Sequence, residues 1–314
     1  MPRTPTNRLA PTWRQADPAR IAAALADAQT RSPGGWLVVG ATGDVPVGRS
    51  VVQTVAGREV VLWRGEDGRL HAGPGACPHL GASLADCPVT GSTLHCKWHG
   101  LGFTPKGRAD WPAIRAHDDG VLIWVQLPGA DAELSDGPPV LPPRPAPDRS
   151  VAAVIAVRGR CEPRDVIANR LDPWHGSWLH PYAFSHLTVD DDASTTGRLV
   201  VDVAFRLGRK YGVPVRAEFF CPDARTIVMQ IVDGEGTGSV VETHATPIGR
   251  DEQGGPITQV TEATIAYSDR SGFRAATRLA GLLRPAMRRT ARQLWVDDLA
   301  YAERTYAVRA GELG

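Results

Sequence analysis

Short hydrophobic runs, each bounded by turn residues, follow one another between residues 36 and 127. β-Branched and aromatic residues are frequent in these runs, and the turns between them include the sequences GEDG and DDG. Short runs of this composition, separated by Gly and Asp, are typical of antiparallel β-strands. The pattern predicts a small antiparallel β domain with strands at residues 51–55, 59–64, 70–73 and 121–127.

A second series of alternating hydrophobic and polar residues begins near residue 150. A strand is predicted at residues 151–158, and a helix is predicted to start near Pro163. Alternation with a period of two, interrupted by Gly- and Asp-bearing turns, then predicts a curved antiparallel sheet. Its strands are expected at residues 197–207, 213–221, 225–233, 239–248 and 258–268.

The chain ends in a long helical pattern from Gly272 to about Arg309, and we expect a break near Pro285. Apolar residues recur at helical spacing and can pack on the sheet, namely Leu294, Trp295, Leu299 and Tyr306. A sheet wrapped around a long C-terminal helix is a helix-grip (START-like) arrangement. The predicted fold class is therefore α+β, with an N-terminal antiparallel β domain followed by a helix-grip domain.

Seven prolines lie between residues 128 and 149, which favours an extended linker over a regular element. At the other end of the chain, Pro- and Thr-rich residues 1–16 predict an arm over the surface. Asp17 can cap a short helix that has Pro18 at its first position. The predicted organisation is an arm and short helix, a β domain, a linker and a C-terminal domain at residues 1–35, 36–127, 128–149 and 150–314.

Composition excludes several classes of function. A net charge of +1, with both signs interspersed, indicates neither a nucleic-acid groove nor an acidic tail. No apolar run approaches the about 20 residues that cross a bilayer, and the N-terminus lacks the order of a signal peptide. Cys87, Cys161 and Cys221 have no disulfide-framework spacing, which is typical of a reducing compartment. We expect a soluble, cytoplasmic protein without a nucleic-acid partner or a membrane span.

Two mixed pairs of cysteine and histidine lie in the predicted β domain. Cys77 and His79 form a Cys-x-His pair, and Cys96 and His99 form a Cys-x-x-His pair. This is the ligand set of a Rieske [2Fe–2S] centre, in which one iron keeps two Cys and the other takes two His. Structural zinc is the alternative, but zinc fingers usually pair Cys with Cys and His with His. Neutral imidazole raises the reduction potential, which suits a relay between a low-potential donor and an oxygen-using site.

The segment from about Trp36 to Trp124 resembles the Rieske domain of the Rieske non-haem iron oxygenases. The resemblance includes both ligand pairs, the run GREVVLWRGEDGRLHA before the first loop and HGLGF after the second. Two positions depart from the family, which usually has Arg where this chain has Leu80 and Pro where it has Lys97. Neither residue would bind iron, so the resemblance implies the same cluster with a different surface beside it.

A second group of polar residues follows the predicted start of the C-terminal domain. Asp172, His175 and His180 form the pattern Asp-x-x-His-x-x-x-x-His, and Asn169 precedes the aspartate by three positions. Two His and one carboxylate on one face of Fe(II) leave the opposite positions open for O2 and substrate. Two such histidines alone are weak evidence for an iron site, but a Rieske centre upstream in the sequence requires an acceptor for its electrons.

The pattern also resembles the mononuclear iron motif of the same oxygenases. The resemblance implies that His175 and His180 bind iron, that Asp172 bridges the two metal centres, and that Asn169 is a neighbour of the iron.

The third iron ligand is expected to be a carboxylate on the final helix. Asp297 and Asp298 are the candidates, and both could instead be charges on the helix surface. Asp298 lies beside Trp295 and Leu299, on or near the apolar face of the helix. The family often has an acidic pair, four mainly apolar positions and then Glu, and aligning that Glu with Glu303 selects Asp298. Asp298 is therefore preferred, with Asp297 as the alternative.

The resemblance implies a terminal oxygenase of a multicomponent system. Electrons from NAD(P)H would arrive through a ferredoxin and/or a reductase, and O2 would be used to oxidise a hydrophobic organic molecule. Hydroxylation, demethylation and desaturation are all open, and the short chain favours the homotrimeric, monooxygenase-like branch. In such a trimer, Asp172 would connect a cluster histidine of one protomer with an iron histidine of the next.

Two other functions stay open at this point. The chain could be a Rieske-type electron-transfer protein with a non-catalytic C-terminal ligand-binding domain. It could also be a helix-grip ligand-binding protein whose cluster senses redox state. A bound mononuclear iron, and O2 consumption that depends on substrate, distinguish the oxygenase from both.

Overall fold

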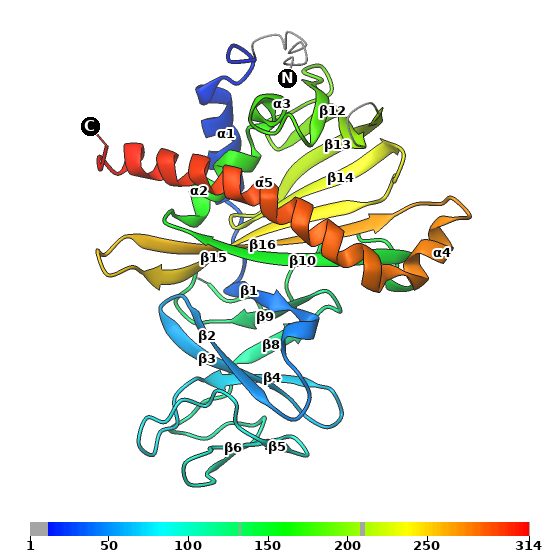
Figure 1. Ribbon diagram of the computed structural model, residues 1–314. Coiled ribbons are helices and arrows are strands. Elements are labelled where there is room, and N and C mark those ends of the chain that lie inside the picture. Colours follow the sequence, from blue (N-terminus) through cyan, green and yellow to red (C-terminus); the bar gives the residue numbers. More distant parts are fainter. Residues whose placement is uncertain (1–11, 132, 208–210, 314) are drawn as a thin grey trace, which may run out of the picture.

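The computed structural model describes residues 12–131, 133–207 and 211–313, and Figure 1 shows a smaller and a larger part. Three small antiparallel sheets build the smaller part within the described residues. The first sheet has the order β1-β9-β8, with bounds Trp36–Ala41, Leu122–Gln126 and Arg115–Asp118. The second is β2-β3-β4, with bounds Ser50–Val55, Arg58–Arg64 and Leu70–Pro74. The third is β5-β6-β7, with bounds Val89–Thr90, Thr93–His95 and Gly102–Phe103.

One antiparallel sheet dominates the larger part, and seven strands of it lie in the described residues in the order β10-β16-β15-β14-β13-β12-β11. The predicted α+β fold class is thereby confirmed. The strand β11 was not predicted, because its Ser, His and Thr residues interrupt the hydrophobic pattern. The bounds from β10 to β16 are Ser150–Gly159, Phe184–Val189, Arg198–Leu207, Tyr211–Asp223, Thr226–Gly234, Val240–Arg250 and Pro256–Tyr267.

The helix α5, Ala280–Arg309, lies along the large sheet, and the short helix α4, Phe273–Arg278, precedes it (Figure 1). The predicted break near Pro285 is wrong, because α5 continues through this residue. Pro285 lies in the second turn, where it removes one backbone donor to the carbonyl of Gly281. Gly281 is exposed, so water can satisfy that carbonyl. None of the helices in the described residues is both long and apolar enough to cross a membrane.

The predicted N-terminal helix is confirmed as α1, Pro18–Gln29. The side chain of Asp17 accepts a hydrogen bond of 2.9 Å from the backbone N–H of Ala19, which is the expected capping contact. One face of α1, including Leu25, is buried against the C-terminal part. Residues 1–11 of the predicted arm lie outside the described residues.

Arg144 in the proline-rich segment connects the two parts of the protein. Its guanidinium donates to Glu242 on β15 at 2.6 Å and lies 2.8 Å from the carboxylate of Asp119, in the loop before β9. Burial alone would raise the pKa of each carboxyl group, but the contacts with Arg144 lower both pKa values below the ordinary range. His244 adds a contact of 3.2 Å to Glu242, and Trp124 donates to Asp119 at 2.7 Å. One linker cation therefore stabilises two buried carboxylates, one from each part.

Arg144→Met is expected to lower the free energy of unfolding by about 3–5 kcal/mol, because it leaves two buried carboxylates without their cation. Denaturation with guanidinium chloride, followed by tryptophan fluorescence, measures the change. Arg108→Met is the matched control, since Arg108 pairs with Asp110 at the surface, with side chains 42% and 54% exposed. The control should change stability by less than about 0.5 kcal/mol. Equal losses in the two variants would contradict the role of Arg144.

Candidate metal centres

Two loops with the same backbone pattern carry the cysteine and histidine pairs. In each loop the cysteine N–H donates to the carbonyl five residues later, and the cysteine carbonyl accepts from the glycine four residues later, at 2.8–2.9 Å. These glycines, Gly81 and Gly100, have φ angles of 73° and 74°, which other residues rarely adopt. The repeated turn explains why both loops have Gly at the same distance after Cys77 and Cys96.

The two loops bring the four predicted cluster ligands together at the tip of the smaller part. Cys77 and Cys96 are buried in one hydrophobic cluster, whereas His79 and His99 are exposed with ring centroids 4.9 Å apart. Burial, reinforced by the neighbouring thiol of Cys96, raises the pKa of Cys77 above its ordinary value. Two inner thiols and two outer imidazoles fit a [2Fe–2S] cluster that has a Cys-bound and a His-bound iron.

The second group of predicted ligands lies at the C-terminal part. The helix α2, Pro163–Arg170, is followed by the 3-10 turn η3, Pro173–His175, and by the one-turn helix α3, Gly176–Leu179. This short helical segment turns His175 and His180 toward the same side. Their Nε2 atoms lie 3.1 Å and 2.8 Å from Oδ1 of Asp298 on α5. The ligand atoms of the three residues are all within 4.8 Å of one another, which is close enough to hold one metal ion.

Asp298 is only 1% exposed although it is acidic. Burial alone would raise its pKa, but the contacts with His175 and His180 outweigh this effect and hold the pKa well below the ordinary range. Burial acts against the charge on His175, and the carboxylates of Asp172 and Asp298 nevertheless raise its pKa to about 9. The carboxylates that raise the pKa of His175 attract positive charge to this place. A divalent cation would supply that charge, with neutral imidazoles and one carboxylate as its ligands.

The geometry distinguishes the two neighbouring aspartates of α5. Asp298 faces the Nε2 atoms of both histidines, whereas the carboxylate of Asp297 lies 3.6 Å from Nδ1 of His180. Asp297 also accepts a hydrogen bond of 2.6 Å from the hydroxyl of Tyr182. These contacts support Asp298 as the iron ligand and give Asp297 the position of a group that orients His180.

Asn169 and Asp172 contact this group from α2 and the residues after it. The amide nitrogen of Asn169 lies 3.4 Å from Oδ1 of Asp298. Asp172 lies 3.7 Å from Nδ1 of His175 and accepts a hydrogen bond of 3.3 Å from Tyr301. Each of the two side chains has one buried oxygen without a hydrogen-bond partner among the described residues. Both residues are thus placed to orient ligands, and Asp172 keeps one acceptor free.

Tyr182 and Tyr301 are two site residues that the sequence analysis missed. Burial and the nearby Asp172 raise the pKa of Tyr301 to about 12, so this hydroxyl remains a donor at neutral pH. Tyr301 follows Asp298 by three positions on the same helix, and Tyr182 follows His180 by two. The spacing of three positions places Tyr301 on the same side of the helix as Asp298, so the sequence could have predicted Tyr301. The contact of Tyr182 with Asp297 depends on how α5 packs, so the sequence could not predict it.

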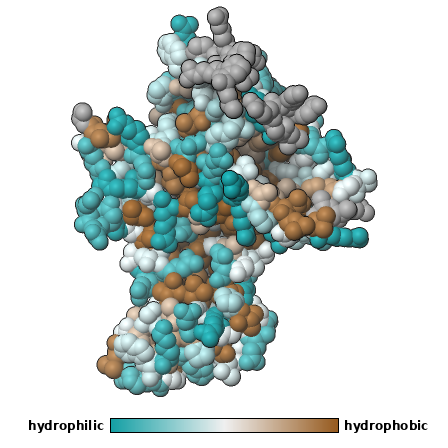
Figure 2. All heavy atoms as spheres, in the orientation of Figure 1, coloured by the Kyte–Doolittle hydropathy of each residue, from teal (hydrophilic) through white to brown (hydrophobic). Residues whose placement is uncertain are grey.

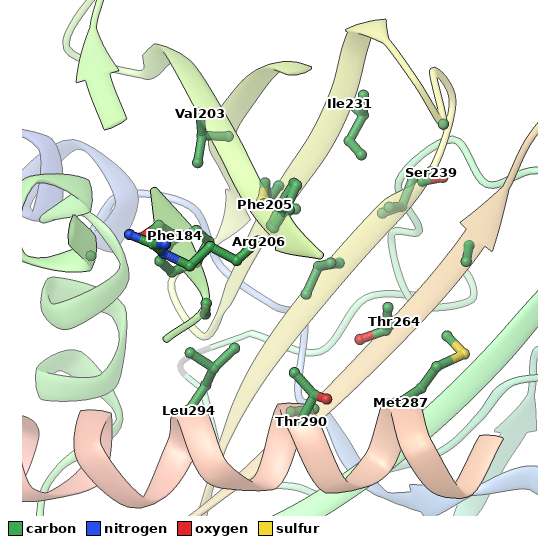
Figure 3. Close-up of a pocket in the computed structure, with 18 of the residues that line it drawn as sticks. Phe184, Val203, Phe205, Arg206, Ile231, Ser239, Thr264, Met287, Thr290 and Leu294 are labelled. Atoms are coloured by element: carbon green, nitrogen blue, oxygen red, sulfur yellow. The ribbon is translucent and has the colours of Figure 1, made fainter. Parts of the chain in front are cut away.

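A cavity of about 1440 Å³ lies between α5 and the large sheet and reaches the His175–His180–Asp298 group. In Figure 3 side chains of α5 face side chains of the sheet across it, among them Leu294, Thr290, Met287, Val203, Phe205 and Ile231. Near α4 the leucines Leu279, Leu282 and Leu283 are exposed, and Figure 2 shows hydrophobic spheres over this end of α5. The cavity is large and mainly apolar, with the polar ligand group at one side.

The two groups of candidate ligands lie in different parts of the molecule, one in the smaller part and one in the larger part. The cluster loops are in the region of β5 and β6, and the His–Asp group lies beside α3 and the middle of α5 (Figure 1). The sheets β1-β9-β8 and β2-β3-β4 lie between them in this view. Within one chain, the two centres are therefore not neighbours.

The fold and the two groups of side chains fit an iron–sulfur protein in which a second group, beside a large cavity, could hold a metal ion. Residues 35–123 match the family model described as Rieske [2Fe-2S] domain, and residues 130–313 match the one described as Domain of unknown function (DUF5914). The chain belongs to the DUF5914 family by its C-terminal part, which makes up more than half of it, and it carries a Rieske [2Fe–2S] domain before that part. The expected Rieske domain and its cofactor class are thereby confirmed, while the individual ligands remain predictions.

Known proteins resemble the chain to different extents. The oxygenase component of chloroacetanilide N-alkylformylase from Rhizorhabdus wittichii (strain DC-6 / KACC 16600) is 28% identical over 60% of this chain and 55% of its own length. The chain spans about half, or less, of the curated relatives it matches. Dicamba monooxygenase bound to dicamba has a TM-score of 0.64 at 18% identity, with 88% of each chain covered. The reduced complex between oxygenase and ferredoxin in carbazole 1,9a-dioxygenase has a TM-score of 0.57 at 16% identity, covering 91% of this chain and 86% of the other. Both structures share the fold.

Asp298→Asn is expected to lower the iron content by about one atom per chain, because the amide replaces the charged ligand that faces both histidines. The visible and electron paramagnetic resonance spectra of the [2Fe–2S] cluster should stay unchanged. Asp297→Asn is the matched control on the neighbouring position and should retain the mononuclear iron. Loss of this iron in Asp297→Asn instead of Asp298→Asn would reverse the assignment.

Proposed function

We propose that this protein is the terminal oxygenase of a multicomponent system and oxidises a hydrophobic organic small molecule with O2 and electrons from NAD(P)H. The observation that carries the proposal is the buried His175–His180–Asp298 group beside a cavity of about 1440 Å³. A buried carboxylate between two imidazoles is costly to maintain, and an electron carrier has no use for it. The oxygenase is therefore favoured over an electron-transfer protein with a non-catalytic ligand-binding domain.

The residues of the site have separate tasks in this proposal. Ferrous iron, when bound, would supply the chemistry of O2 activation. His175, His180 and Asp298 hold the metal from one side, so that the other side is left for O2 and substrate. Asn169 orients Asp298, and Asp297 with Tyr182 orients His180. The apolar cavity walls bind the substrate and keep water away from the site.

Electrons are proposed to come from a ferredoxin and/or an NAD(P)H-dependent reductase. Support comes from the curated relative that is named an oxygenase component and from the oxygenase–ferredoxin complex with the same fold. Such a donor would dock near the cluster loops, on a surface that a neighbouring protomer leaves uncovered. A cytoplasmic location is part of the same proposal.

A ring-like homotrimer is proposed because the two ligand groups of one chain lie far apart. Beside the cluster histidines, Leu80 and Trp98 are exposed, although large apolar side chains are usually covered. Beside the second centre, Trp178 is exposed in the same way. Head-to-tail contact between these surfaces would close into a ring and bring one chain's cluster next to another chain's Asp172.

Monooxygenation, including demethylation, is favoured over dioxygenation for this chain, and desaturation is a related outcome. The relative named an N-alkylformylase and another named a desaturase are consistent with several outcomes on a common site. The cavity size and its apolar walls support a ring-bearing or terpenoid substrate.

Iron quantitation and O2 uptake test the proposal together. Protein loaded anaerobically with ferrous iron should hold about three irons per chain, and a carrier would hold about two. With a surrogate ferredoxin and reductase, candidate hydrophobic substrates should stimulate O2 consumption and give oxygenated or desaturated products by mass spectrometry. Two irons per chain, with no O2 uptake above that of the donor system alone, would exclude the oxygenase.

Asp172→Asn is expected to retain all three irons but to lower substrate-dependent turnover by about tenfold to a hundredfold, because the link between the two centres loses its charge. Turnover is measured as product formed with the surrogate donor, and iron content is measured on the same samples. Asp192→Asn is the matched control, since Asp192 is an exposed aspartate in the turn between β11 and β12. Unchanged turnover in Asp172→Asn would contradict the bridging role.

A further inference from the structure

Three arginines of the described residues line the cavity, and one of them has no hydrogen-bond or ion-pair partner among these residues. Arg206 donates to the carbonyl of Phe184 at 3.1 Å, and Arg270 pairs with Glu235 at 2.6 Å. The side chain of Arg170, at the end of α2, makes no hydrogen bond or ion pair with any residue that the structure describes, and its buried Nε has no partner. Arg170 is half-buried, and guanidinium groups that leave water are normally paired, so this one has capacity for a ligand.

Two aromatic rings hold Arg170 in place. Its guanidinium carbon lies 5.9 Å from the ring centroid of Phe219 and 5.9 Å from that of Trp295. Such contacts with ring faces stabilise a cation without using its hydrogen-bond donors. The side chain is therefore positioned on the cavity wall while its planar set of donors remains available.

Trp295 also holds a second cavity residue, Glu262 on β16. The indole N–H donates to Oε2 of Glu262 at 2.7 Å, so one tryptophan contacts Arg170 with its ring face and Glu262 with its edge. Glu262 and Arg170 both line the cavity but do not form an ion pair within 4.0 Å. Burial raises the pKa of Glu262, although the charge of Arg170 and the hydrogen bond from Trp295 oppose this.

We propose that Arg170, with Glu262 beside it, binds an anionic oxygen group of the substrate, such as a carboxylate, in the cavity. The inference rests on the proposed function in taking this cavity as the substrate site, and it narrows the substrate class to hydrophobic acids. The planar fork of Arg matches the two oxygens of a carboxylate, and the apolar walls match the remainder of the molecule.

The site lies next to the metal-ligand group. Arg170 directly follows Asn169, whose amide contacts Asp298, and Trp295 precedes Asp298 by one turn of α5. A substrate anchored by its acid group at Arg170 would therefore present the carbon atoms near that group to the iron. The position of oxidation is set by the anchor rather than by the apolar walls alone.

A matched pair of fluorescent probes tests the anion preference. 1-Anilinonaphthalene-8-sulfonate and N-phenyl-1-naphthylamine share an aromatic framework, and only the first carries a sulfonate. Wild-type protein should bind the sulfonate at least about tenfold more tightly. Arg170→Met should weaken sulfonate binding by about tenfold to a hundredfold and leave the neutral probe unchanged, because one charged contact is lost. Laurate should displace the bound sulfonate at lower concentration than dodecanol.

Three further variants locate the effect. Arg206→Met is the matched control, because it removes another cavity arginine whose Nε is already bonded to a backbone carbonyl, and it should alter neither affinity by more than about threefold. Thr290→Trp fills the cavity and should abolish binding of both probes. Arg170→Lys keeps the charge without the planar fork and should give an intermediate affinity for the sulfonate, which keeps the test valid if Arg170→Met is poorly folded.

The inference is overturned if wild-type protein binds the two probes equally or not at all, or if Arg170→Met keeps the preference. Probe binding requires neither electrons nor O2, so its result is independent of turnover. If the protein consumes O2 but shows no anion preference, only this inference is refuted. An anion preference without O2 consumption would instead count against the proposed function alone.

Discussion

A buried carboxylate, Asp298, is the constraint around which the C-terminal part is arranged. An aspartate that is 1% exposed costs several kcal/mol unless other groups compensate for the lost water. Two imidazoles and the amide of Asn169 provide this compensation from α2 and the short helical segment that follows it. The helix α5 must therefore keep one rotational setting against the sheet, and its buried Trp295 and Leu299 stabilise that setting.

The same physical rule operates at the junction of the two parts. Glu242 and Asp119 are buried carboxylates from different segments, and Arg144 of the linker compensates both. A proline-rich segment without a long regular element can thereby still fix how the parts sit together. In both places a charge is kept in the interior because a partner that is distant in the sequence meets it there.

Trp295 connects the core with the cavity. It is fully buried among the hydrophobic residues under the sheet, yet its N–H bonds to Glu262 and its ring face contacts Arg170. The residue that packs α5 therefore also positions two polar groups of the cavity wall. Packing and recognition depend on one another here, because a shift of α5 would move the metal ligand Asp298 and these polar groups together.

Features that depend on neighbours in the chain could be predicted from the sequence. The capped helix α1, the strands of the large sheet except β11, and the two Cys–His loops each follow from spacings of a few residues. The predicted break at Pro285 was wrong, since a proline near an exposed helix start costs one hydrogen bond that water can replace.

The choice between Asp297 and Asp298, the contacts of Tyr182 and Tyr301, and the partners of Arg144 and Arg170 required the tertiary structure. Most of these contacts join residues about a hundred or more positions apart, and the choice between the two aspartates depends on the rotation of α5 against the sheet. Local propensity carries no information about either, because both are decided by how all the elements pack at once.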